Sequence, residues 1–423
     1  MKQLRYLLKR EFRLFFTNKT MLSVFFMAPA FYALLIGFTY KKGKVENIPV
    51  IVINHDKTPL SDQVTQMFED NHTIKVLNYI DEPAPLKDEV IKTEAAAVVI
   101  IPERFEALML QKKYPEITVY INTSNVLTAN FATKAIQQIL GTFSAGAEIK
   151  ALQRKGMNAE IAKTQYEPFK ANYITLFNTT SNYLIFMWPA MMAVVLQQVI
   201  LMAMAVTFAE EFKRDSFKRD FAGKHKYAVL VMAIKCLPVW IFANLNILFF
   251  YLCSLYFKIP SPVNVPNFFL LTAVFVVAST NLGVLFSILV PDALKATQYL
   301  MVIASPAFIV SGFTWPTSAM PQFVQYFNSI IPLTPYLEAL KIMVVERGSD
   351  YLTQKYFIHL LILALVYFVL GWIALKIKIN SLYKSTIFQK MMKAMISMKL
   401  QHQKTILTKT AQHRKKYKVF ISL

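Results

Sequence analysis

Charged and aromatic side chains alternate in one short segment, AEEFKRDSFKRDFAGKHKY at 209–227. It carries six basic and four acidic residues, with phenylalanines at 212, 217 and 221. Such charges can pair with those of another protein, and an aromatic ring between them can fill an apolar groove. We therefore expect a short amphipathic helix that docks on a partner, although a solvated loop has the same composition. The residues expected to make the contact are Glu210, Glu211, Phe212, Arg214, Asp215, Ser216 and Phe217.

Glu11 is the second residue of interest, because it is the only acid among residues 1–20. At about 100° per residue it falls on the apolar face of a helix, whereas the basic residues fall on the other face. A carboxylate on an apolar face costs free energy unless it is paired or hydrogen-bonded. Glu11 therefore either reaches the lipid headgroups or faces protein, with Lys235 or Arg214 as its basic partner.

Sequence motifs for catalysis, metals and cofactors are absent from the chain. It has no G-x-x-x-x-G-K-[ST], G-x-S-x-G, H-E-x-x-H or C-x-x-C, and no two of its six histidines stand three or four residues apart. ATP binding through a P-loop and metal-dependent hydrolysis are thus not expected. We predict no catalytic, cofactor-binding or metal-binding residue in this chain.

Six apolar runs dominate the sequence, and each approaches the roughly 20 residues that a helix needs to cross a bilayer. They predict an α-helical integral membrane protein with six transmembrane helices. The runs are Met21–Tyr40, Tyr183–Ala209, Ala228–Phe257, Phe268–Val290, Ala296–Phe313 and Tyr356–Leu375.

The net charge of +21 is concentrated next to these runs. Residues 1–20, 209–227 and 376–423 are basic, whereas the insert 41–181 carries sixteen residues of each sign. Positive charge beside a span marks the cytoplasmic side and attracts anionic lipids, so we expect no nucleic-acid partner. The predicted organisation is a cytoplasmic interfacial helix, a first span, an extracytoplasmic insert, five further spans and a basic cytoplasmic tail (1–19, 20–40, 41–181, 182–376 and 377–423).

The insert alternates between strand and helix patterns, which predicts an α/β domain with a partly parallel sheet. Helices are expected at about 58–70, 85–93, 103–111 and 124–156, with Thr58 and Ser124 as caps. The expected strands are 48–54, 74–79, 95–102 and 117–122.

Prolines interrupt the apolar sequence after the fifth run. The piece 322–331 is too short to cross a bilayer, so we expect a helix that dips into the outer leaflet. The residues expected to shape this outer segment are Gly312, Pro316, Pro321, Pro332, Thr334 and Pro335.

These features together resemble the permease subunits of type-2 ATP-binding-cassette exporters that have a large extracytoplasmic domain after the first span. LKREFRLFF resembles the elbow helix of that family, and 209–227 stands where the family has its coupling helix. The strongest likeness is SGFTWPTSAMP followed by IIPLTPYLEALKIMVVERG. The chain departs from the family at Asp215-Ser216, where Gly-Thr is usual.

The resemblance implies a non-enzymatic transport subunit in a bacterial cytoplasmic membrane, with both termini in the cytoplasm. Its partners would be a P-loop ATPase subunit that holds ATP and Mg²⁺, membrane lipids, and a second permease copy in a homodimer or a paralogous heterodimer. The family's cargoes include drugs, peptides, lipids and glycans. There are two alternatives: a phage-receptor or secretion-accessory membrane protein of similar span layout, and a membrane sensor with an outer ligand-binding domain.

Overall fold

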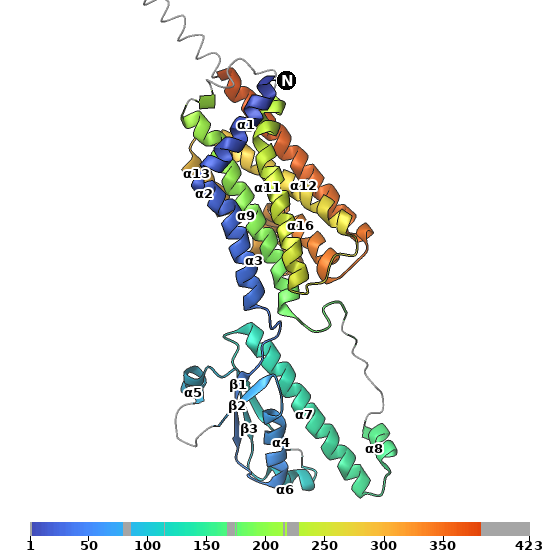
Figure 1. Cartoon of the computed structure of the whole chain (residues 1–423). Coiled ribbons are helices and arrows are strands. Elements are labelled where there is room, and N and C mark those ends of the chain that lie inside the picture. Colours follow the sequence, from blue (N-terminus) through green and yellow to red (C-terminus); the bar gives the residue numbers. More distant parts are fainter. Residues whose placement is uncertain are drawn as a thin grey trace, which may run out of the picture. The chain divides into compact units, whose positions relative to one another are not determined.

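The computed structural model describes residues 2–78, 86–113, 115–166, 174, 176–214, 216, 217 and 228–381. The chain divides into two compact units, one of Met1–Lys41 with Leu176–Leu423 and one of Lys42–Thr175. The first is a helix bundle and the second contains a sheet (Figure 1). Residues 382–423 of the predicted basic tail lie outside the described residues.

Six helices in the described part of the bundle are long and apolar enough to cross a membrane, which confirms the predicted number. The second, α9, packs against α3, α11, α12, α13 and α16 and so lies at the centre of the bundle. The six helices are Lys19–Thr39, Tyr183–Lys213 (α9), Ala228–Tyr256 (α11), Val265–Leu289 (α12), Ala293–Val310 and Asp350–Ser381.

The first of these helices changes its winding next to Pro29. It begins as α2 (Lys19–Leu22), passes through a π-helical turn (Ser23–Met27) and continues as α3 (Ala28–Thr39). Proline has no N–H, so Pro29 cannot donate to the carbonyl of Phe25. Asn246 of α11 fills this vacancy, because its Nδ2 donates to the Phe25 oxygen at 2.9 Å. A side chain of a neighbouring helix thus stabilises the break.

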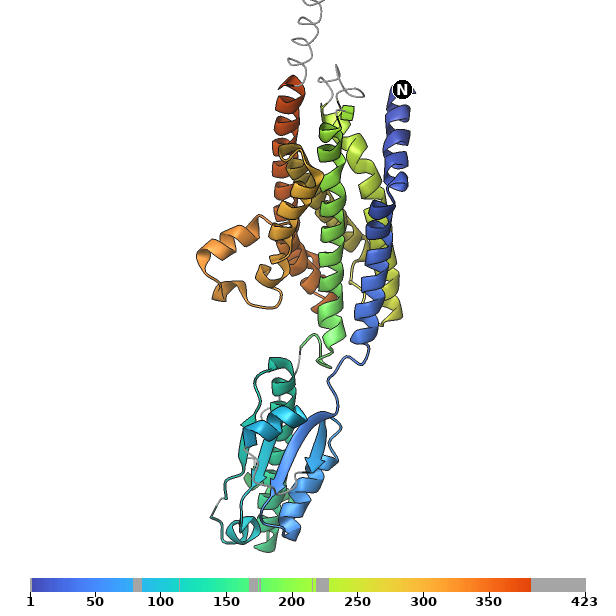
Figure 2. The same cartoon turned by 90° about the vertical axis from the view of Figure 1, so that its left-hand side faces the viewer.

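The fifth helix is broken, which its continuous apolar sequence did not predict. It consists of α13 (Ala293–Ala304) and α14 (Ala307–Val310), with Pro306 at the interruption. Four short elements follow before the last helix: η3 (Thr317–Ala319), α15 (Gln322–Ser329), α16 (Leu333–Leu340) and the π-helix η4 (Lys341–Val345). In Figure 2 the orange segment that contains α15 projects sideways from the bundle.

The sheet of the second unit has the strand order β2-β1-β3-β4. The outer pairs differ: β1 runs parallel to β2 and to β3, whereas β4 is antiparallel to β3. This confirms the predicted partly parallel sheet. The strands are β1 (Ile48–Asn54), β2 (Ile74–Asn78), β3 (Ala97–Ile101) and β4 (Thr118–Ile121).

Helices cover both faces of this sheet. Val50 and Val99 point to the face that packs against α4 and α7, and Ile51 and Val98 point to the face near α5. The alternation of neighbouring residues between two cores follows the two-residue period of a strand. The helices are α4 (Pro59–Glu69), α5 (Leu86–Thr93), α6 (Phe105–Leu110), α7 (Val126–Arg154) and α8 (Ala159–Tyr166).

One of the two predicted helix caps is wrong by one residue. Thr58 caps α4 in a reciprocal capping box with Ser61, as expected of a threonine before a helix. The cap of α7 is Asn125, whose side chain accepts from the amides of Leu127 and Thr128. Ser124 instead donates its hydroxyl to Asn122 at 2.7 Å, so it is not available to the helix.

Close contact between α9 and α12 predicts a large effect for a small substitution. A Cβ at Gly283 would lie 2.6 Å from Cβ of Met204. Gly283→Ala should therefore push the helices apart and cost about 1–3 kcal/mol, seen as a lower temperature of thermal unfolding in detergent. Gly371→Ala is the control, because its nearest neighbour is the terminal methyl group of the Met232 side chain at 3.3 Å. Equal stability of the two variants would show that α9 and α12 can separate freely.

Candidate functional site

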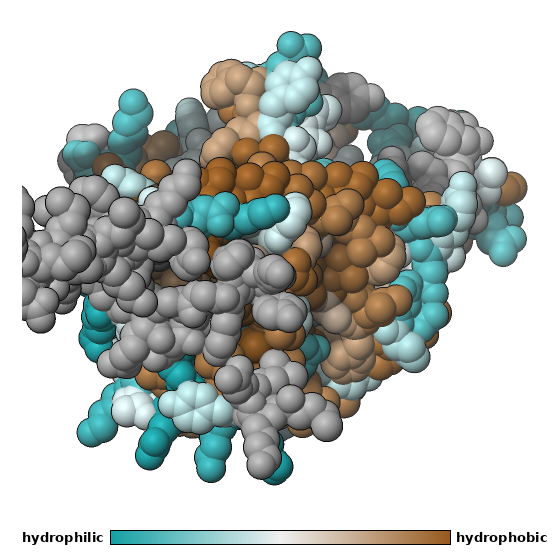
Figure 3. All heavy atoms as spheres, turned by 90° about the horizontal axis from the view of Figure 1, so that it is seen from above, coloured by the Kyte–Doolittle hydropathy of each residue, from teal (hydrophilic) through white to brown (hydrophobic). Residues whose placement is uncertain are grey.

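The amphipathic helix α1 (Lys2–Thr17) packs against α11 at one end of the bundle, which we call the α1 end. Leu7, Glu11 and Phe15 stand four residues apart and are all buried. Phe15 stacks on Phe242 of α11, with ring centroids 4.8 Å apart. Seen from above in Figure 3, apolar side chains gather across this end and hydrophilic ones lie around them. Helix α1 therefore presents Glu11 to protein.

Four charged residues of α1, α9 and α11 form a compact ion-pair cluster: Arg10, Glu11, Glu211 and Lys235. Lys235 Nζ lies 2.8 Å from Glu211 Oε2 and 3.5 Å from Glu11 Oε2. Arg10 completes the ring, with Nη1 2.6 Å from Glu11 Oε1 and Nη2 2.8 Å from Glu211 Oε1. Two cations thus meet two carboxylates, which balances the formal charge.

The ion-pair cluster is shielded from solvent. The side chain of Lys235 is 0 % exposed and that of Glu11 is 6 % exposed. Lys235 Nζ also lies 5.1 Å from the centroid of the Phe208 ring, close enough for a cation–π interaction. Burial raises the pKa of Glu11, and the positive charge of Lys235 opposes this rise. Because unpaired charge is costly here, the cluster holds three helices in one arrangement.

The structure distinguishes between the two basic partners considered for Glu11. Lys235 contacts it, whereas Arg214 pairs with Glu210 on the surface of α9. The participation of Arg10 was not foreseen, although it adjoins Glu11 in the sequence and borders the apolar face of α1. An arginine at that border, opposite a buried acid, is the signal that could have indicated it.

Phenylalanines lie beside the ion-pair cluster and form an aromatic cluster of Phe208, Phe212 and Phe217. The Phe217 ring lies 4.9 Å from that of Phe212 and 6.2 Å from that of Phe208, centroid to centroid. Phe217 is only 2 % exposed. The expectation that this ring fills a partner's groove is therefore not what the structure shows: the ring packs within its own chain. Of the expected docking segment, Asp215 and 218–227 lie outside the described residues.

The surface of the α1 end retains charged groups that a partner can reach. Arg214 is exposed and Glu210 is partly exposed, and Ser216 donates its hydroxyl to the Glu211 carbonyl at 3.4 Å. Lys213 Nζ lies 2.9 Å from Asp292 Oδ2, which joins α9 to the start of α13. The hydrogen bond from Lys213 is the main cause that lowers the pKa of Asp292. Ion pairs at this exposure are weak, so these groups remain available for contacts.

The outer segment owes its shape to the prolines and Gly312. Pro321 and Pro332 directly precede α15 and α16, Pro316 precedes η3, and Pro335 lies in the first turns of α16. Gly312 has a φ of 90°, and a Cβ there would lie 2.6 Å from Cγ2 of Thr317. Only glycine accommodates both conditions without strain.

Hydrogen bonds attach the outer segment to the last helix. Thr334 donates its hydroxyl to the side chain of Asn328, which is 2 % exposed. His359 Nε2 lies 2.8 Å from the carbonyl oxygen of Ser329, and the Tyr367 hydroxyl donates to Ile330. His359 thus has a backbone partner. The segment is held in place at the end of the bundle opposite α1.

Six apolar helices, an amphipathic helix before the first and a proline-shaped segment after the fifth indicate a multi-pass membrane protein. The comparison with known families gives the particular group. Residues 19–376 match the family described as ABC-2 family transporter protein, and the chain belongs to that family. The resemblance to ATP-binding-cassette permeases is thereby confirmed.

Two curated relatives have names that agree with this assignment. One is "ABC transporter G family member 20" of Dictyostelium discoideum, 23% identical over 355 residues, which cover 81% of this chain and 46% of that protein. The other is "Probable multidrug ABC transporter permease YbhR" of Escherichia coli K12, 18% identical over 307 residues, which cover 72% and 80%. The chain therefore spans less than half the length of the Dictyostelium relative.

Proposed function

We propose that this chain forms, together with a second permease copy, the membrane pathway of an ATP-driven exporter. A separate P-loop ATPase would hold ATP and Mg²⁺ and supply the energy. Membership of the ABC-2 family over residues 19–376 is the observation that carries this proposal. The name of the Escherichia coli relative favours drug-like cargo, with lipids and peptides as the other classes to test.

Coupling would occur at the α1 end, which we propose faces the cytoplasm. A force applied to the surface charges of Glu210, Lys213 and Arg214 would act directly on α9, the central helix. Because the ion-pair cluster ties α9 to α1 and α11, these three helices would move together. The aromatic cluster around Phe217 would stiffen the last turn of α9. Movement of the ATPase would therefore be transmitted to the transmembrane helices.

This arrangement predicts the sidedness of the chain in a bacterial cytoplasmic membrane. A cysteine in place of Asn125, at the start of α7, should react with an impermeant thiol reagent on intact cells. A cysteine in place of Gln412 in the basic tail should react only after the cells are opened. The buried native Cys236 and Cys253 should stay unlabelled in both cases. Labelling at 412 in intact cells would contradict the six-span topology.

Purification from membranes that contain the natural partners tests the function. The tagged chain should copurify with a P-loop ATPase, and ATP should be hydrolysed only by preparations that contain this ATPase. The mass of the complex should show that it contains two permease copies. A phage-receptor, a secretion-accessory protein or a sensor would come without such an ATPase. If the chain purified repeatedly without an ATPase, from membranes in which the natural partners are abundant, the proposed function would be excluded.

A further inference from the structure

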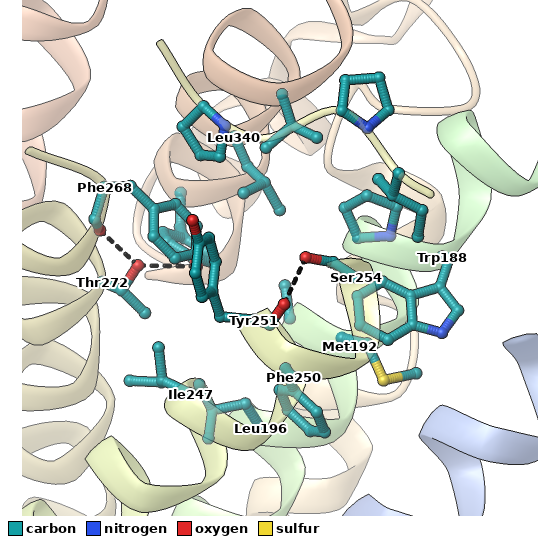
Figure 4. A pocket seen from close by; sticks show the side chains of 17 residues that line it. Trp188, Met192, Leu196, Ile247, Phe250, Tyr251, Ser254, Phe268, Thr272 and Leu340 are labelled. Atoms are coloured by element: carbon teal, nitrogen blue, oxygen red, sulfur yellow. Dashed lines mark hydrogen bonds between the residues drawn. The ribbon is translucent and has the colours of Figure 1, made fainter. Parts of the chain in front are cut away.

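A cavity lies inside the helix bundle, between α9, α11, α12 and α16 (Figure 4). It encloses about 520 Å³ of empty space, its mouth included. Only about 50 Å³ of this space is open to the centre of a water-sized sphere, so the cavity is a narrow slot. The residues that determine its chemistry are Trp188, Met192, Phe250, Tyr251, Thr272 and Tyr336.

The wall of the cavity is apolar, and the indole of Trp188 and the hydroxyl groups of Ser254, Thr272 and Tyr336 have hydrogen-bond partners within the chain. Trp188 Nε1 donates to the carbonyl of Ala33 at 3.0 Å, and the hydroxyl groups of Thr272 and Tyr336 lie 3.1 Å apart. Ser254 donates to the Tyr251 carbonyl at 2.7 Å. No lining residue that the structure describes is an acid or a basic residue. An ion, sugar or charged peptide would lose its hydration here without gaining a partner.

The mouth of the cavity opens on an apolar surface. Among the lining residues, Tyr251 and Ser254 of α11 and Phe268 of α12 are partly exposed, whereas Trp188 and Phe250 are buried. The neighbours of these mouth residues are outward-facing leucines, with Leu252 55 % and Leu270 54 % exposed. In a membrane-spanning bundle such a surface contacts lipid. A molecule that enters this way must come from the hydrocarbon phase.

We propose that the cavity binds one hydrocarbon chain of an amphiphile dissolved in the membrane. The hydrocarbon chain of the amphiphile would extend along Met192 and Phe250 towards Trp188. The polar end of the amphiphile would stay at the mouth of the cavity beside Tyr251 and Ser254. All the residues that line the cavity belong to one copy of the chain. This proposal rests on the bundle being in the membrane and does not depend on an ATPase.

Trp188 provides a direct reporter for this site. In a variant with Trp240, Trp315 and Trp372 replaced by Phe, Trp188 is the only tryptophan. In nanodiscs of unbrominated phosphatidylcholine, a bromine-labelled single-chain fatty alcohol should quench its fluorescence in a saturable way. Excess unbrominated alcohol should restore the fluorescence. In a second arm, nanodiscs of brominated phosphatidylcholine show whether a bilayer lipid occupies the same site.

A cavity-filling variant links the quenching to the cavity itself. Ala193 lines the cavity and is 4 % exposed, so Ala193→Phe should raise the half-saturating alcohol concentration by about tenfold or more. Leu365→Phe, on the exposed side of the last helix, should leave it unchanged. The competition by unbrominated alcohol stands without any variant if Ala193→Phe does not fold. Absence of quenching in both arms, or quenching that neither saturates nor responds to the competitor, would overturn the proposal.

Discussion

Lys235→Met should destabilise the helix bundle by about 3–5 kcal/mol, because it leaves Glu11 and Glu211 buried with one cation between them. Thermal unfolding of the purified chain in detergent measures the effect. Lys213→Met is the matched control: its ion pair with Asp292 has a similar 2.9 Å length, but the lysine side chain is 63 % exposed. That variant should lose less than about 1 kcal/mol.

Two further variants distinguish charge pairing from packing in the ion-pair cluster. Exchanging the charges in Lys235→Glu with Glu211→Lys should recover part of the stability that either single change removes. Glu11→Gln should lower transport or the yield of dimer while the chain still inserts into the membrane. Single and double variants of equal stability, together with unchanged behaviour of Glu11→Gln, would mean that the cluster does not hold the three helices together.

Phe217→Ala should abolish most of the coupling between the ATPase and the spans. The substitution removes a buried ring that contacts Phe212 and Phe208, a type of change that costs about 3–5 kcal/mol. The last turn of α9 would loosen, so that ATP hydrolysis continues without moving the bundle. ATP hydrolysis and cargo transport, measured together in proteoliposomes, should separate in this variant and remain linked in the natural chain.

Arg214→Ala instead removes an exposed charge of the proposed contact surface, since Arg214 is 73 % exposed and pairs only with its neighbour Glu210 among the described ion pairs. It should reduce coupling far less than Phe217→Ala. The sequence alone indicates that Phe217 contacts a partner, whereas in the structure the ring packs inside its own chain. If both variants coupled ATP hydrolysis to transport as well as the natural chain does, the segment would not belong to the coupling pathway.

Local pattern determined which features were predictable. The six apolar helices and the four strands follow from the length and period of runs such as Tyr183–Ala209, which any fold must bury or embed. The buried position of Glu11 followed from its place on a helical wheel. Its partner could not be chosen that way, because Lys235 stands 224 residues away and only packing brings the two together.

Other features depend on contacts that no single segment encodes. Phe217 has the spacing of an exposed anchor, yet the turn after α9 folds it back onto Phe212. The break at Pro306 is hidden in a run that hydropathy treats as one span. Ser124 and Asn125 are both good caps, and the bond of Ser124 to Asn122 decides between them.

Site-specific cross-linking to the ATPase tests the central claim most directly. A photoreactive residue placed at Arg214, on the exposed surface of the α1 end, should cross-link to a P-loop ATPase in native membranes. One placed at Trp315, which is 60 % exposed in the outer segment at the opposite end, should not. The account predicts a cross-link from position 214 alone. Cross-linking of the ATPase from position 315, or from neither position while the complex is intact, would contradict it.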